Sequence, residues 1–312
     1  MRIVFMGTPD FAVPSLEMLV KEGYEVVAVI TQPDKPKGRG NKMTAPPVKE
    51  FALKHQIKVL QPEKIKTPEF IDQIRAFIPD LLITAAYGKI LTKELLEVPV
   101  YGCINVHGSL LPAYRGAAPI NWAVIKGEKK TGITTMYTDV GVDTGDMLLK
   151  KELEIGSDMT VGELHDKMSV LGAEVLMETL TALINGTLQR IPQEDSQSSY
   201  APMMNKELGH IDWNKSALEI HNLVRGTDPW PGAYTFLLGN RMRVWKTSLV
   251  PGKSDTEIDN GKILKVDDEG ILVKCPDGNL MIKEVQFDSS KRMSVGDYIR
   301  GHEINAGETL GK

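Results

Sequence analysis

An asparagine and a histidine lie two positions apart near the middle of the chain, Asn105 and His107 in the stretch YGCINVHGSLLPAYRGAA at 101–118. Residues 103–107 read as a short buried strand, and residues two apart on a strand point to the same side of the sheet. An amide N–H can stabilise a developing oxyanion, and an imidazole can donate or move a proton. The pair is suited to acyl or proton transfer. Taken alone, this spacing also fits an ordinary strand end with a hydrogen-bonded histidine.

Three carboxylates follow the next predicted strand, in the turn-rich loop DVGVDTGD at 139–146. Asp139, Asp143 and Asp146 alternate with two glycines, a composition that equally suits local turn hydrogen bonds. One of the three can accept a proton beside His107 or fix its tautomer, and spacing alone leaves the choice among them open. No second acidic cluster with metal-ligand spacing occurs, so we expect no metal site.

Alternating strands and helices must position these side chains. Short apolar runs predict strands at 2–6, 25–30, 57–60, 80–85, 103–107 and 132–138. Helical patterns fall between them at 13–22, 47–55, 70–77 and 119–126. This rhythm predicts a mainly parallel, doubly wound α/β sheet, in which ligands bind beyond the carboxyl ends of the strands. The turn after the first strand reads GTPD and lacks the glycines of a dinucleotide fingerprint, and no phosphate-binding GxxxxGK[ST] occurs, so a nicotinamide enzyme and an ATP-driven reaction are disfavoured.

The composition and periodicity of the chain change after a long helix predicted at 160–184. Residues 190–206 lose periodicity and gain serine, glutamine and proline, which is typical of a linker. Beyond them, short strands without intervening helices predict a small β-barrel or sandwich. These strands are expected at 241–250, 261–266, 270–275 and 279–285. We therefore predict an N-terminal domain at 1–189, a linker at 190–206 and a C-terminal β domain at 207–312.

Composition is that of an ordinary globular protein. The 312 residues are 42% hydrophobic and 25% charged, which suits two domains. Cys103 and Cys275 lie far apart without CxxC spacing, which argues against a disulfide framework and fits a reducing cytoplasm. We expect no signal peptide, no membrane span and no need for more than a monomer. The net charge of −4 means that local basic patches would have to attract any nucleic acid, with binding that weakens as salt rises.

A basic, glycine- and proline-rich stretch precedes the second predicted helix. Residues 33–49 read PDKPKGRGNKMTAPPVK, with five basic residues against one acid. Such a composition is typical of a surface loop. It fits either a solvated loop or a flap that contacts RNA phosphates or bases. Arg39 stands between two glycines, so in the second case its side chain is the one expected to contact the RNA.

The stretches NVHGSLLPAYRGAAPINWA and DVGVDTGD together resemble the 10-formyltetrahydrofolate-dependent formyltransferases. Within that family, the resemblance to the members that act on methionyl-tRNA covers essentially the whole chain. The motifs that carry it further are MGTPDFAVPSLEML, TQPDKPKGRG, AAYGKIL, IDW at 211–213 and DPWPGAY at 228–234. It implies a Rossmann-like N-terminal domain, a linker and a C-terminal OB-like barrel that holds tRNA.

The same resemblance implies a reaction and roles for named residues. The formyl group of 10-formyltetrahydrofolate would pass to the α-amino group of methionine on initiator tRNA. Catalysis would fall to Asn105, His107 and, among the three carboxylates, Asp143. Arg39 would contact the tRNA. The folate co-substrate would lie against the loop Ser109, Leu110, Leu111 and Pro112, and no metal would take part.

Three other functions remain open from the sequence. A formyltransferase acting on glycinamide ribonucleotide or an amino sugar nucleotide would use the same three catalytic residues, although the glycinamide enzyme lacks a C-terminal barrel. A folate hydrolase or dehydrogenase module would replace the amine by water or hydride, and a dehydrogenase needs further domains. A non-catalytic RNA-binding protein would use the barrel alone and leave Asn105, His107 and Asp143 without a role.

Overall fold

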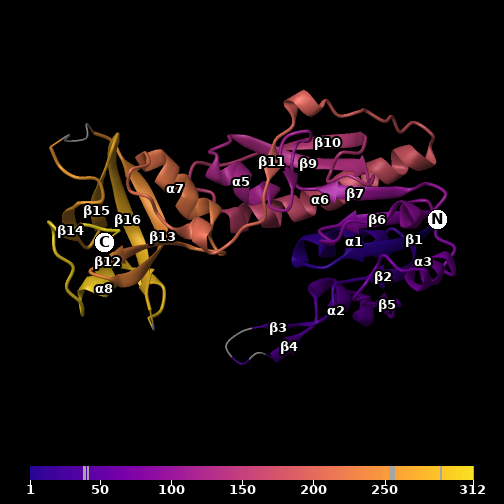
Figure 1. Ribbon diagram of the computed structural model, residues 1–312, viewed down its shortest axis with the longest axis horizontal. Helices are drawn as coiled ribbons and strands as arrows, with labels where there is room; N and C mark the ends of the chain where they lie inside the picture. The colour runs from indigo at the N-terminus through magenta and orange to yellow at the C-terminus, as the bar shows by residue number, and fades with distance from the viewer. Residues whose placement is uncertain (38–39, 41, 253–256, 289, 312) are drawn as a thin grey trace. The chain divides into compact units, whose positions relative to one another are not determined.

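The computed structural model describes residues 1–37, 40, 42–252, 257–288 and 290–311. The chain forms two compact units (Figure 1). Unit 1 consists of Met1–Pro119, Lys130–Glu154 and His165–Pro202, and unit 2 of Ile120–Lys129, Ile155–Leu164 and Met203–Lys312. Two short segments from within the predicted N-terminal domain therefore cluster with the C-terminal residues. The functional division into 1–189, 190–206 and 207–312 stays a prediction.

Unit 1 is built on a seven-stranded sheet. In spatial order its strands are β10 (Met147–Glu154), β9 (Lys130–Tyr137), β7 (Cys103–His107), β6 (Leu81–Ala85), β1 (Arg2–Gly7), β2 (Glu25–Ile30) and β5 (Val59–Leu60). The pairs from β7 to β5 are parallel, and β9 and β10 run antiparallel at one edge. The mainly parallel α/β sheet predicted from the sequence is confirmed. Strand β10 was not predicted, because its second half alternates charged residues and is only partly buried.

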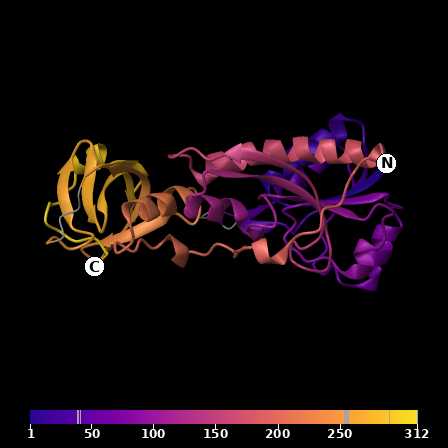
Figure 2. The same ribbon diagram turned by 90° about the horizontal axis from the view of Figure 1, so that it is seen from above.

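Helices cover both faces of this sheet (Figure 2). They are α1 (Val13–Lys21), α2 (Pro47–Lys54), α3 (Pro68–Arg75), α4 (Lys93–Leu96) and the long α6 (Val161–Ile184), which begins among the residues of unit 2. On β1, Val4 and Met6 pack in one cluster with Phe70 of α3. On the alternate positions of the same strand, Ile3 and Phe5 are equally buried on the other face. Strands covered on both faces need apolar residues at every position, which explains the continuous hydrophobic runs.

Unit 2 contains a second sheet of antiparallel strands. These are β12 (Ala233–Leu237), β13 (Asn240–Val250), β16 (Gly278–Phe287), β15 (Gly270–Cys275) and β14 (Ile263–Asp267), with β17 (Met293–Ser294) beside β16. Its helices are α5 (Pro119–Ile125), α7 (Ala217–Gly226) and α8 (Val295–Ile299). The chain end ties the two edges of the sheet, because the N–H of Leu310 donates to Gly261 and that of Gly311 to Phe236. The antiparallel C-terminal sheet is confirmed, and its OB-like character stays a prediction.

Smaller elements complete the fold. Two-stranded pairs are formed by β3 (Lys35–Lys37) with β4 (Lys42–Thr44) and by β8 (Arg115–Gly116) with β11 (Tyr200–Ala201). Short 3₁₀ turns lie at Asp10–Ala12, Asp195–Gln197 and Glu207–Gly209. Among the helices that the structure describes, none is both long and apolar enough to cross a bilayer.

Candidate active site

His107 is the last residue of β7 and is buried, with 5% of its surface exposed. Its Nε2 lies 3.0 Å from the carbonyl oxygen of Tyr114, and its Nδ1 lies 3.6 Å from Oδ2 of Asp143. A carbonyl oxygen only accepts, so Nε2 carries a proton and donates a hydrogen bond to the carbonyl oxygen of Tyr114. The other ring nitrogen therefore faces the carboxylate.

Asp143 lies in the loop between β9 and β10, in the left-handed backbone region with φ 53°. Aspartate is one of the few residues other than glycine that tolerates this conformation. Its Oδ2 accepts a hydrogen bond of 2.8 Å from the backbone N–H of Gly116. Gly116 has φ 115°, and a side chain there would meet the carbonyl oxygen of Ala201 at 2.7 Å. The approach of this backbone N–H to the carboxylate thus requires glycine.

The structure distinguishes the three carboxylates of this loop. Asp143 is the one whose side chain reaches His107. Asp139 accepts hydrogen bonds from the hydroxyl of Thr144 at 2.7 Å and from the N–H of Gly141 at 3.0 Å, so it closes the turn. The choice that spacing left open is therefore decided by geometry, although the catalytic role of Asp143 stays a prediction.

Asn105 lies two residues before His107 on β7 and pairs in register with Thr84 of β6. The hydroxyl of Thr84 donates to Oδ1 of Asn105 over 2.8 Å. That bond orients the side-chain amide, so Nδ2 is the end that remains as a donor. An amide donor, an imidazole and a carboxylate are thus held around the end of one strand.

The other polar group on β7 is a thiol. Cys103 is buried, and burial raises its pKa to about 11. At neutral pH the group is a neutral thiol, which is neither a good nucleophile nor a metal ligand. Cys103 packs in the core on the α3 side of the sheet, so the geometry gives it a packing role.

The loop after β7, which was predicted to line a folate site, is held rigid from within. Ser109 is fully buried and donates its hydroxyl proton to the carbonyl oxygen of Ala113 over 2.6 Å. Leu111 is buried against two methionines of β9 and β10. Leu110 and Pro112 are partly exposed. Ser109 and Leu111 therefore support the loop, and Leu110 and Pro112 form its surface, while the folate-binding role of all four stays a prediction.

The basic segment at 33–49 is only partly described, and Arg39 lies outside the described residues. Its flanks form the hairpin β3–β4, on which Lys35 and Lys42 are exposed. Lys49 is not available to a ligand, because its Nζ bonds to Asp34 at 2.8 Å and to Gln61 at 2.7 Å. Hydrogen bonds from Lys49 and then Gln61 lower the pKa of Asp34.

Gln193 was missed by sequence reasoning. It lies in the aperiodic stretch predicted to be a linker, and its Nε2 donates to the carbonyl oxygens of Asp143 at 2.9 Å and Gly145 at 2.8 Å. A single amide side chain between non-periodic neighbours gives no pattern that could have indicated this contact. Among the described residues, no group of three or more His, Cys, Asp or Glu side chains could hold a metal ion.

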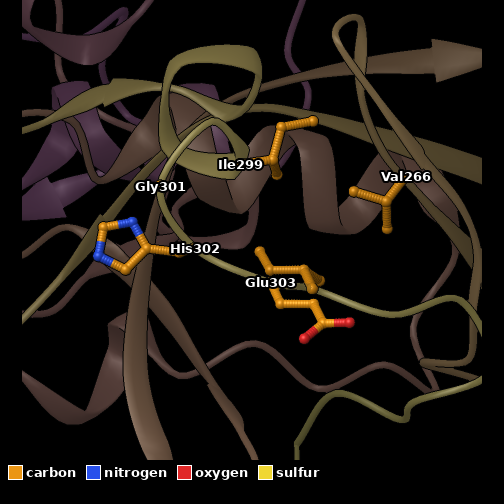
Figure 3. A pocket seen from close by; sticks show the side chains of 6 residues that line it. Val266, Ile299, Gly301, His302 and Glu303 are labelled. Carbon is orange, nitrogen blue, oxygen red and sulfur yellow. The ribbon is translucent and has the colours of Figure 1, made fainter.

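A separate, shallow pocket of about 400 Å³ lies in unit 2 (Figure 3). Its described lining comprises Val266, Ile299, Gly301, His302, Glu303 and Ile304. The ring of His302 stacks on Tyr298, with centroids 4.2 Å apart, so it is held as part of the domain's own packing. That described lining includes none of Asn105, His107, Asp143 and the 109–112 loop.

A parallel α/β sheet whose strand end gathers an amide, an imidazole and a carboxylate has the makeup of a group-transfer enzyme. Residues 1–180 match the sequence profile of the family "Formyl transferase", and residues 203–303 match "Formyl transferase, C-terminal domain". A methionyl-tRNA formyltransferase of Ruminiclostridium cellulolyticum is 70% identical over 312 residues, and one of Acetivibrio thermocellus is 64% identical, each over 100% of both chains. The chain therefore belongs to the methionyl-tRNA formyltransferases within the formyl transferase family, and it is a formyl-transferring enzyme.

Solved structures share the fold at low sequence identity. An N-formyltransferase from Helicobacter canadensis, in complex with folinic acid and dTDP-3-aminofucose, aligns with TM-score 0.66 and 21% identity over 90% of this chain and 98% of that one. HypX from Aquifex aeolicus in complex with tetrahydrofolic acid aligns with TM-score 0.61 and 18% identity over 99% of this chain. The chain spans about half of that longer protein, 50% of its length. At these identities the likeness shows the fold alone.

Proposed function

We propose that this enzyme transfers the formyl group of 10-formyltetrahydrofolate to the α-amino group of methionine on initiator tRNA. The full-length relatives named methionyl-tRNA formyltransferase support the acceptor, and the folate compounds named with the neighbouring structures support the donor. The observation that carries the mechanism is the 3.6 Å contact between His107 and Asp143 at the end of β7, beside the amide of Asn105.

The reaction forms a bond between the methionine nitrogen and the formyl carbon and breaks the bond from that carbon to folate. During this exchange the formyl oxygen gains negative charge, the attacking nitrogen loses a proton and the departing folate nitrogen gains one. We assign stabilisation of the oxygen to Nδ2 of Asn105, since Oδ1 is already bonded to Thr84. We assign movement of the proton to His107 and Asp143, whose Nδ1 and Oδ2 lie 3.6 Å apart and need only a small approach to form a hydrogen bond.

The folate co-substrate would lie against the loop that follows β7. Leu110 and Pro112 offer partly exposed apolar surface, while buried Ser109 and Leu111 keep the loop in one shape. A rigid apolar wall suits a flat aromatic ring, because little freedom is lost when the ring binds.

The tRNA would meet the protein at two places, the first being the 33–49 segment. Exposed Lys35 and Lys42 flank Arg39 and suit contacts with phosphates. We propose that Arg39 reads the acceptor stem. Replacing Arg39 by leucine should raise the KM for tRNA much more than the KM for folate, and equal losses on both substrates would contradict the role.

The second place is the outer side of the hairpin of unit 2, which we call the β12–β13 face. It consists of the partly exposed Tyr234, Phe236, Arg241 and Arg243, together with the largely buried ring of Trp245. The guanidinium of Arg241 lies 3.9 Å from the ring centroid of Tyr234, and that of Arg243 lies 5.8 Å from the ring of Trp245. Nε of Arg241 is a buried donor without a partner among the described residues. Arginines held on aromatic rings present charge to phosphates and flat surfaces to bases, which suits RNA.

A direct assay tests the acceptor. The purified protein is given 10-formyltetrahydrofolate with methionine-charged initiator tRNA, with glycinamide ribonucleotide or with a dTDP-amino sugar, and N-formylated product is measured. We expect formylation of the charged tRNA alone. Turnover of a small amine with none of the tRNA would overturn the proposal. The variant Asp143→Asn serves as the matched control, and we expect it to lose most of this formylation.

We further propose that the enzyme acts as a monomer in the cytoplasm. Both cysteines are buried, Cys103 on β7 and Cys275 on β15, which is compatible with a reducing compartment. Sedimentation of the purified protein with and without tRNA would measure the stoichiometry, and a stable dimer would contradict the monomer.

A further inference from the structure

The stretch predicted to be a linker lies against the candidate active site within unit 1. Ile191 and Met147 of β10 exchange two backbone hydrogen bonds of 2.9 Å. Further along, the carbonyl oxygen of Ser199 accepts from the N–H of Arg115, and β11 pairs with β8. The segment is therefore fastened at both ends to the two loops that surround His107.

The side chain of Gln193 bonds to both of those loops. Its Nε2 donates to the carbonyl oxygens of Asp143 and Gly145 in the β9–β10 loop, at 2.9 and 2.8 Å. Its Oε1 accepts from Nε of Arg115 over 3.0 Å. Arg115 is itself 9% exposed, and its guanidinium forms an ion pair of 2.9 Å with Asp195 of the same segment. Every polar atom of the Gln193 amide is thus committed to the site loops.

These contacts fix the part of the chain that aims the Asp143 carboxylate. The backbone at Asp143 lies in the left-handed region, which an L-residue occupies at a cost. Its carbonyl oxygen is held by Gln193 and its Oδ2 by the N–H of Gly116, next to Arg115. The two anchors act at opposite ends of one residue, so they set the direction of the carboxylate towards His107.

We propose that Gln193 is a positioning residue for formyl transfer: its side-chain amide holds Asp143 in the orientation that reaches His107. The proposal rests on the proposed function, in which Asp143 acts together with His107. The hydrogen bonds of the Gln193 amide go to Arg115, Asp143 and Gly145, so the residue acts through the loop that carries Asp143.

The first test is the variant Gln193→Met, which keeps the length of the side chain and removes its hydrogen bonds. We expect kcat to fall by about tenfold to a hundredfold, since a shift of about 1 Å in a catalytic group has an effect of that order. The KM values for both substrates should stay within about threefold, because substrate binding is not the step affected. The matched control is Gln197→Met, whose amide bonds only to exposed Glu194 in the same segment, and its kcat should stay near wild type.

A purely structural role for Gln193 gives a different result. The folded variant would then keep its kcat, and only its thermal midpoint would fall. That outcome, at a temperature where both proteins are folded by circular dichroism, would overturn the proposal.

A double-variant cycle separates this proposal from the proposed function. If Gln193 works only through Asp143, Asp143→Asn combined with Gln193→Met should lose no more kcat than Asp143→Asn alone. Losses that multiply would overturn the positioning role. If Asp143→Asn itself keeps near-native turnover, the proposed catalytic pair fails instead. If Asp143→Asn is inactive while Gln193→Met is unchanged, only the positioning role fails.

Gln193→Glu adds a readout that depends on pH. The carboxylate would place an acceptor against the carbonyl oxygens of Asp143 and Gly145, whereas the neutral acid restores one donor. The ratio of variant to wild-type kcat should therefore rise as pH falls towards the titration of the new group. A ratio that is flat with pH would contradict the donor role of the amide.

Discussion

The end of β7 in unit 1 and the β12–β13 face in unit 2 use polar side chains in opposite ways. At the end of β7, His107 is almost fully buried, and hydrogen bonds of 2.8 to 3.0 Å fix His107, Asp143 and Asn105. On the β12–β13 face, Arg241 and Arg243 are partly buried, with their guanidinium groups 3.9 Å from the ring centroid of Tyr234 and 5.8 Å from that of Trp245. The first region holds a few polar atoms in fixed positions, and the second presents positive charge beside aromatic rings.

This contrast indicates how each region should respond to substitution. A side chain that acts on one bond in one geometry contributes to the rate only in that position, so removing it abolishes its whole contribution to kcat. A surface that gathers charge and stacking area is weakened in steps, and its effect depends on salt. The first region should therefore control kcat and the second the KM for tRNA.

The largest effect is expected at His107. His107→Ala removes the imidazole that faces Asp143, and kcat should fall by about 10² to 10⁴, the usual contribution of a positioned acid or base. Steady-state kinetics measures it. The control is His165→Ala on α6, whose ring lies against Phe11 in unit 1 and should leave kcat unchanged. A His107→Ala enzyme within tenfold of wild type would remove the imidazole from the mechanism.

The next effect is expected at Asn105. Asn105→Ala should lower kcat by about 10² to 10³ through the loss of one oxyanion donor. Thr84→Val removes the hydroxyl that orients the amide and leaves Asn105 in place, so its loss should be smaller. If Thr84→Val were the more damaging change, the hydroxyl and not the amide would be the donor.

The β12–β13 face should give a smaller effect of another kind. Arg241→Ala and Arg243→Ala should each raise the KM for tRNA by about threefold to tenfold, with the kcat and the KM for folate unchanged. The slope of log affinity against log salt should become shallower by about 1 for each phosphate that the variant no longer binds. Lys215→Ala, on an exposed residue paired with Glu219, is the control. Equal changes for folate and tRNA would show that the face does not bind RNA.

The smallest effect is expected at Cys103. Because burial raises the pKa of its thiol to about 11, Cys103→Ala should keep kcat within about twofold between pH 7 and 9. The missing sulfur should cost about 1 kcal/mol of stability, measured by urea unfolding. A collapse of turnover in a folded Cys103→Ala protein would point to a covalent step at sulfur.

The sequence predicts the parallel part of the sheet well, because strands buried on both faces leave unbroken apolar runs such as those of β1 and β6. It misses β10, whose exposed half reads as alternating charge, and β12, whose short run follows a proline-rich turn. Both strands are recognisable only through their partners β9 and β13. Patterns of hydrophobicity report burial and carry little information about edge pairing.

The candidate site also has a part that the sequence indicates and a part that only the structure shows. The spacing of Asn105 and His107 places both at one strand end, as the structure has them, and the family resemblance selects Asp143 from three carboxylates. The contacts that aim Asp143 come from Gly116 and Gln193, far apart in sequence and in stretches without periodicity. Such contacts depend on the path of the folded backbone, and no local pattern in the sequence encodes them.

The interleaving of the two units has a consequence for dissecting the molecule. The turn that precedes α6 is held by residues of α7, since Arg225 donates to the carbonyl oxygens of Gly156 and Met159 and His221 bonds to Ser157. Asn121 of α5 likewise bonds to Gly226. A fragment that ends at Pro202 would keep these segments and lose their partners on α7. A chimera with a sugar-modifying relative would therefore need to exchange 120–129 and 155–164 together with the C-terminal residues, because no single cut separates the two modules.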